Sequence, residues 1–107
     1  MDISDDRLKK ALTYLAETDV EAAKAKAYGE GLSEQRKSIK ALLFNDAQGS
    51  NEVRTNIAYA SDEYRDHVDK LTVAIKDFEI LKNKRLTEAL IVEVWRSCNA
   101  NRRSGNL

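Results

Sequence analysis

Hydrophobic residues in the second half of the sequence recur at intervals of four, three, four and three positions. The series comprises Tyr64, Val68, Leu71, Ile75 and Phe78. This spacing keeps the side chains on one side of an α-helix and is typical of a helix that packs against another helix. Since neither proline nor glycine interrupts residues 61–99, the pattern predicts one helix over residues 62–99. A helix of this length cannot bury its own seam, so it requires a second segment, a second copy or a partner.

The beginning of the chain predicts a shorter helix over residues 4–16. Ser4 is a good N-cap, and the two aspartates that follow it suit the positive end of the helix dipole. One apolar stripe on this helix comprises Leu8, Leu12 and Leu15.

A second helix start is predicted at Thr18. Thr18 and Glu21 form a capping-box pattern, which indicates a bend near Glu17 and a new helix over residues 19–46. Its predicted apolar face comprises Ala25, Tyr28, Leu32, Ile39 and Leu42. Gly29 and Gly31 weaken this helix by about 1 kcal/mol each relative to alanine. They mark either close helix packing or a break, and the sequence leaves both readings open.

The clearest turn of the chain lies around Gly49. Glycine adopts the left-handed conformation that ends many helices, and Ser50 is placed to cap the next helix, over residues 52–59. The tail over residues 100–107 is rich in Asn, Ser and Gly, and it is predicted to be disordered.

These elements predict an all-α protein of one domain, residues 1–107, built as a long antiparallel helical hairpin with a shorter N-terminal helix. The C-terminal half of the long helix is apolar around much of its circumference, which favours more than one neighbour and therefore self-association. The candidate protein interface consists of the seam and three later residues: Tyr64, Val68, Leu71, Ile75, Phe78, Leu90, Val94 and Trp95.

Charge is balanced overall but is unevenly distributed. The chain has 18 basic and 18 acidic residues, whereas residues 80–107 carry six basic and two acidic groups. The candidate nucleic-acid contacts are these six: Lys82, Lys84, Arg85, Arg96, Arg102 and Arg103. Such a cluster contacts phosphates independently of base sequence, or it simply complements a helix C-terminus and solvates an exposed face. Trp95 likewise has two readings, as a platform for an unpaired base or as an apolar anchor, and the anchor is preferred.

Residues suited to catalysis or metal binding are sparse. His67 is the single histidine, it lies between two aspartates, and it is expected to be an exposed surface residue with Glu63 as a local neighbour. Cys98 is the single cysteine, so no disulfide forms within the chain and a reducing compartment is expected. We therefore expect no enzyme activity, no metal site and no cofactor.

The N-terminal residues are polar and acidic rather than signal-like, and no window approaches the roughly 20 apolar residues of a membrane span. The sequence thus predicts a cytoplasmic protein without a membrane contact.

Three segments carry a resemblance to a known group of proteins. They are residues 59–64 (YASDEY), 78–85 (FEILKNKR) and 93–97 (EVWRS). This part of the chain resembles small, all-helical proteins of tailed bacteriophages, encoded among early genes of DNA metabolism. The resemblance implies a protein-binding accessory factor in DNA replication or recombination, located in the host cytoplasm, with weak contact to single-stranded nucleic acid as an additional expectation. The alternative is a phage-encoded inhibitor that binds a host or defence protein through its helical surface.

Overall fold

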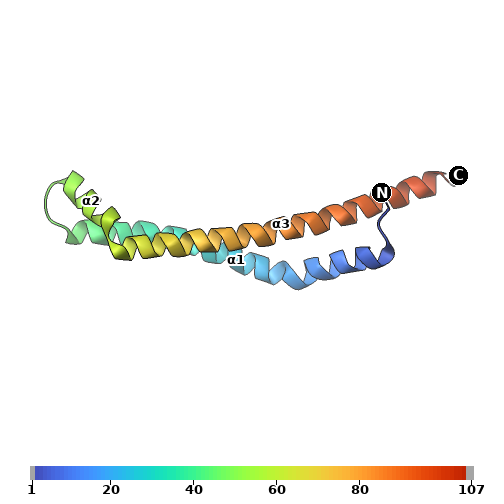
Figure 1. Ribbon diagram of the computed structural model, residues 1–107, viewed down its shortest axis with the longest axis horizontal. Helices are drawn as coiled ribbons and strands as arrows, with labels where there is room; N and C mark the ends of the chain where they lie inside the picture. The colour runs from blue at the N-terminus through green and yellow to red at the C-terminus, as the bar shows by residue number, and fades with distance from the viewer. Residues whose placement is uncertain (1, 106–107) are drawn as a thin grey trace. The chain divides into compact units, whose positions relative to one another are not determined.

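The computed structural model describes residues 2–105, and this part of the chain is all-helical. It contains α1 (Asp5–Asp46), α2 (Asn51–Ala60) and α3 (Asp62–Gly105) (Figure 1). No strand occurs among the described residues. The predicted all-α class and the helical hairpin are therefore confirmed.

The predicted division of the first 46 residues into two helices is wrong. A single helix of 42 residues covers both predicted segments, and the short helix of the fold is α2 rather than an N-terminal one. Instead of capping a new helix, the Thr18 hydroxyl donates a hydrogen bond of 2.7 Å to the carbonyl oxygen of Tyr14, one turn earlier. This bond satisfies the hydroxyl inside a continuing helix, so the capping-box pattern at Thr18 does not coincide with a helix terminus.

The helix termini otherwise follow their capping residues. The Ser4 hydroxyl accepts a hydrogen bond from the backbone amide of Arg7, and the Ser50 hydroxyl accepts one from Val53. Gly49 adopts a φ of 118°, which a residue with a side chain rarely adopts. The predicted caps at Ser4 and Ser50 are thus confirmed, as is the left-handed turn.

At its other end, α3 continues to Gly105, so the prediction of disorder is wrong for residues 100–105. Arg102 and Arg103 lie in the last turn, where positive charge favours the negative end of the helix dipole. Residues 106 and 107 lie outside the described residues.

The chain divides into two compact units, and each long helix contributes one half to each unit. Unit 1 pairs the described residues up to Ala23 with those from Glu79 onward, and unit 2 is Lys24–Phe78. In unit 1, Arg7 contacts Glu88 and Thr18 contacts Arg85, so the two segments run antiparallel. Unit 2 is a hairpin closed by the Gly49 turn and α2, with Leu32, Leu71 and Ala74 as its buried cluster. The single domain predicted from the sequence stays a prediction.

The packed face of α1 follows a strict repeat of three and four residues, which differs from both predicted stripes. Leu12 and Tyr28 are about half exposed and Leu42 is more exposed still, whereas Ala11 and Leu32 are buried. The buried and half-buried positions of the repeat are Leu8, Ala11, Leu15, Thr18, Ala22, Ala25, Gly29, Leu32, Arg36, Ile39 and Leu43. Small and polar residues thus occupy several positions of a seam that is typical of coiled coils.

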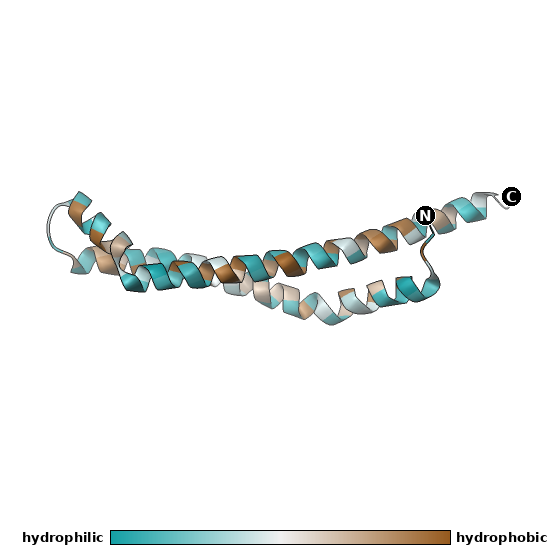
Figure 2. Ribbon diagram, in the orientation of Figure 1, coloured by the Kyte–Doolittle hydropathy of each residue, from teal (hydrophilic) through white to brown (hydrophobic). Residues whose placement is uncertain are grey.

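The predicted seam of α3 is partly confirmed. Leu71 is buried and Tyr64, Val68 and Phe78 are half-buried, but Ile75 is 49% exposed and Ala74 is buried in its place. Hydrophobic and hydrophilic stretches alternate along the ribbon of α3 (Figure 2).

Gly29 and Gly31 neither break α1 nor allow a close approach. Both lie inside the helix, and a methyl group added at either position meets nothing within 4 Å. Both readings that the sequence left open for these glycines are therefore wrong.

Candidate interaction surfaces

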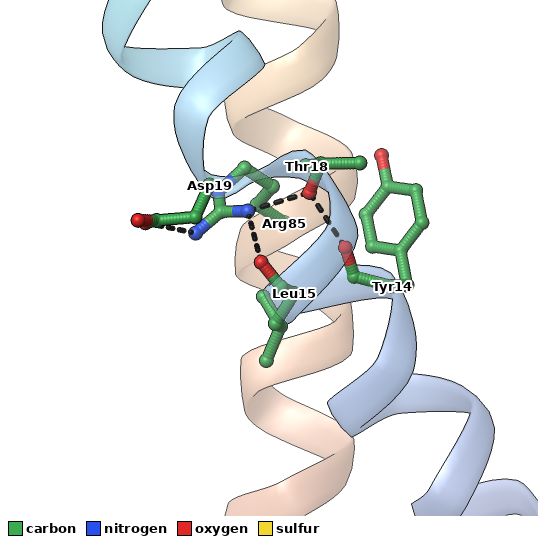
Figure 3. Close-up of polar contacts among 5 residues, drawn as sticks. All are labelled: Tyr14, Leu15, Thr18, Asp19 and Arg85. Atoms are coloured by element: carbon green, nitrogen blue, oxygen red, sulfur yellow. Dashed lines mark hydrogen bonds and ion pairs between the residues drawn. The ribbon is translucent and has the colours of Figure 1, made fainter.

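Among the basic residues predicted to contact nucleic acid, Arg85 has the most hydrogen-bond and ion-pair partners. Its Nη1 donates to the carbonyl oxygen of Leu15 at 2.8 Å and to the Thr18 hydroxyl, and its Nη2 lies 3.4 Å from a carboxylate oxygen of Asp19 (Figure 3). Only 22% of its side chain is exposed. Arg85 therefore joins the two segments of unit 1, which leaves little of its guanidinium for a phosphate.

The other five predicted nucleic-acid contacts are exposed, but they do not form one uncompensated surface. Arg96 pairs with Glu93 at 3.2 Å, and Arg102 lies 3.5 Å from Asp2. Within the described chain, no ion pair engages Lys82, Lys84 or Arg103. Because Lys82 and Lys84 lie about five turns of helix or more before Arg102, the six residues are not brought together.

A further ion pair in unit 1 joins two residues that the sequence did not single out. Arg7 Nη2 lies 2.8 Å from Oε1 and 2.7 Å from Oε2 of Glu88. The Oε2 atom is buried and accepts no hydrogen bond from the described residues, so it meets Arg7 as an ion pair only. Arg7 thus supplies the positive charge that compensates the Glu88 carboxylate.

The prediction of an exposed His67 is wrong. The ring is half-buried, and Nε2 lies 2.7 Å from the carbonyl oxygen of Leu32. Because a carbonyl oxygen only accepts, Nε2 carries the hydrogen and donates it. His67 therefore links α3 to α1 within unit 2.

Trp95 and its neighbours lie on different faces of α3. Trp95 is half-buried, and its Nε1 donates to a carboxylate oxygen of Asp5 at 3.3 Å, so it contacts the first turn of α1. Val94 is half-buried, whereas Leu90 is 64% exposed. Leu86 is also exposed and lies one turn before Leu90 on the same face. These two leucines are the apolar row of unit 1, a surface that the described residues leave exposed.

Unit 2 has an open groove between α1 and α3, with a volume of about 490 Å³. Its apolar lining comes from Ala25, Tyr28, Val73 and Ala74, of which Tyr28 and Val73 are about half exposed. Lys70 and Asp77 flank it, seven residues apart on α3 and therefore on one face. We call this surface the Tyr28 groove.

A different hollow lies toward the turn of unit 2 and combines positive charge with aromatic rings. Its lining is Arg36, Lys37, Lys40, Tyr59 and Tyr64, and its volume is about 250 Å³. Lys40 Nζ bonds the Tyr59 hydroxyl and lies 4.3 Å from the centre of that ring, and the Tyr59 and Tyr64 rings meet edge to face at 5.3 Å. The sequence alone did not identify this site, because Tyr59 and Tyr64 reach it only through the fold. We call it the basic–aromatic hollow.

The described residues contain no group of three potential metal ligands among His, Cys, Asp and Glu side chains. None of the helices in residues 2–105 is both long and apolar enough to cross a membrane. The sequence matches no protein-family model, and it has no significant similarity to the curated proteins or the solved structures compared with it.

Proposed function

We propose that this protein is a non-enzymatic accessory factor that acts through protein–protein contacts and associates with a second copy of itself. The observation that carries the proposal is the Tyr28 groove, because its charges are self-complementary. Lys70 and Asp77 are the charged residues of the lining, and neither forms an ion pair with another residue of the described chain. An apolar surface bordered by unpaired opposite charges suits a partner with the same pattern in reverse.

A second copy provides that pattern when two α3 helices meet antiparallel about a two-fold axis between Val73 and Ala74. Residue 70 of each copy then lies opposite residue 77 of the other, so that two equivalent Lys–Asp pairs form. Ala25 and Ala74 present small side chains there, which permits close approach, and the exposed parts of Tyr28 and Val73 become buried.

Charge reversal tests this arrangement directly. Lys70→Asp places two acidic residues opposite each other at both ends of the interface, and Asp77→Lys places two basic ones there. We expect each single variant to weaken dimerisation about tenfold, and the double variant Lys70→Asp/Asp77→Lys to restore it, as measured by sedimentation equilibrium. Lys70→Asp combined with Asp46→Lys, a charge reversal of the same sign at an exposed residue outside the Tyr28 groove, is the matched control and should remain weakened. A wild-type chain that is monomeric at high concentration, or a double variant as weak as the single ones, contradicts the proposal.

The role in DNA replication or recombination rests on the resemblance of residues 59–64, 78–85 and 93–97 to phage proteins, and the apolar row of Leu86 and Leu90 supports contact with a further protein. A capture experiment from host lysate, comparing the wild type with Leu86→Glu/Leu90→Glu, tests that contact. Recovery of a replication or recombination protein supports the accessory role. Recovery of a host defence protein supports the inhibitor instead.

A further inference from the structure

We infer that the basic–aromatic hollow of unit 2 binds phosphate groups of a single-stranded nucleic acid. The inference takes its ligand from the proposed role in DNA transactions, but it does not depend on self-association. It also places the nucleic-acid contact away from the C-terminal residues that the sequence favours.

The side chains of the hollow suit an oxyanion. All five described residues that line it are basic or aromatic. Arg36 and Lys40 lie one turn apart on the same face of α1, and the guanidinium of Arg36 matches a phosphate with two parallel hydrogen bonds. The two phenol hydroxyls, of Tyr59 and Tyr64, add hydrogen-bond donors from α2 and α3.

The positive charge of the hollow is largely uncompensated. Arg36 forms no ion pair with another residue of the described chain. Lys37 pairs with Glu34 at 3.2 Å, but both side chains are exposed by more than 60%, and ion pairs exposed to solvent contribute little to stability. Lys40 contacts the hydroxyl and ring of Tyr59, which are neutral. A phosphate that binds here therefore disrupts few favourable contacts that these side chains already make.

A polymer fits this region better than a single ion does, because a second hollow adjoins the first. It has a volume of about 320 Å³ and shares Lys37 and Lys40 with the basic–aromatic hollow. Its further lining residues are Ala41, Phe44, Asn45 and Thr55. Arg54 lies against the Phe44 ring at 4.1 Å, which adds another cation beside an aromatic surface. Adjoining basic and aromatic sites are typical of proteins that bind single strands through phosphates and stacked bases.

The experiment measures the binding of a fluorescently labelled oligothymidylate to the full chain by fluorescence anisotropy at low salt. Lys37→Gln/Lys40→Gln removes the two lysines that both hollows share. Lys37 is exposed and Lys40 is half-buried, and neither belongs to the buried cluster. We expect affinity to fall at least tenfold, and the slope of log affinity against log salt concentration to decrease by about 1.4, which is roughly 0.7 for each lost cation.

Lys82→Gln/Lys84→Gln is the matched control, since it removes the same charge from the C-terminal cluster. We expect it to retain affinity within about twofold. If the control loses as much affinity as the first variant, or if the wild type does not bind at low salt, the inference is overturned. Neither result affects the charge-reversal test of dimerisation, so failure of this inference is distinguishable from failure of self-association.

Inorganic phosphate separates the two sources of the ligand. In a titration followed by the backbone amide signals of Lys37 and Lys40, we expect shifts with the oligonucleotide at micromolar concentration and with inorganic phosphate only at millimolar concentration or above. Comparable affinity for the two overturns the nucleic-acid assignment and leaves a site for a free anion.

Discussion

Three polar side chains of α3 occupy positions that face α1: His67, Arg85 and Glu88. Each has a specific counterpart, namely the carbonyl oxygen of Leu32, the Leu15–Asp19 turn of α1, and Arg7. Leucine at these positions would pack in several registers, whereas a polar group left without its counterpart costs free energy in every register but one. Within each unit, these contacts therefore select the register at which the two helix segments pair.

The Arg7–Glu88 pair gives a prediction at this scale. We expect Arg7→Met to lower the free energy of unfolding by about 1–2 kcal/mol, because it leaves a mostly buried carboxylate without its compensating charge. Adding Glu88→Leu should recover most of that loss, since no charge is then left unpaired. Urea denaturation measures both effects. A double variant less stable than Arg7→Met alone would contradict this expectation. It would show that Glu88 stabilises the fold through contacts other than its ion pair with Arg7.

At the scale of the element, the face that a helix buries depends on its partner as well as on its own pattern. Ile75 belongs to the apolar seam of α3, yet it is 49% exposed, while the smaller Ala74 is buried with Leu32 and Leu71. In a left-handed coiled coil, the packed positions of a helix follow one another at alternating intervals of three and four residues. Ala74 lies three residues after Leu71 and Ile75 lies four residues after it, so both positions fit this spacing. The pairing with α1 selects Ala74.

This difference predicts unequal losses of stability for two similar substitutions. Leu71→Asp buries an unpaired charge and is expected to cost about 3 kcal/mol or more, enough to unfold much of the chain. Ile75→Asp places the charge at a half-exposed position and is expected to cost about 1 kcal/mol or less. Thermal unfolding followed by circular dichroism distinguishes the two. Equal losses for both variants would mean that Ile75 is buried as deeply as Leu71, either in the chain or in an assembly.

At the scale of the whole molecule, the two units differ in how the chain closes them. Unit 2 is one continuous segment, which the Gly49 turn and α2 close, and it contains the buried cluster. Unit 1 joins the two ends of the chain, with contacts between residues 66 to 100 positions apart, such as Arg85–Asp19 and Arg102–Asp2. Long-range closure costs more conformational entropy than local closure, so the units are expected to open at different free energies.

Native-state hydrogen exchange measures that difference. We expect the amides of Leu32 and Leu71 in unit 2 to exchange at least tenfold more slowly than those of Ala11 and Val92 in unit 1, after correction for intrinsic rates. Equal protection throughout α1 and α3 would contradict this expectation and show that both units open together.

The sequence by itself determined the elements that depend on local interactions. The helical class follows from the apolar periodicity and from the absence of proline, and the caps at Ser4 and Ser50 and the turn at Gly49 follow from side chains that act within a few residues. The local rule failed at Thr18, because its hydroxyl is equally well satisfied by the Tyr14 carbonyl oxygen inside an unbroken helix.

Only the tertiary structure decided which face each helix buries and which polar residues meet. Several stripes on α1 are apolar enough to pack, and the contacts of α3 select the one that contains Ala11 and Leu32 and exposes Leu12 and Tyr28. The same pairing commits Arg85 to α1 and brings Tyr59 and Tyr64 beside the basic residues of α1. The physical reason is that burial and polar pairing are properties of two surfaces together, and residues far apart in the sequence supply the second surface.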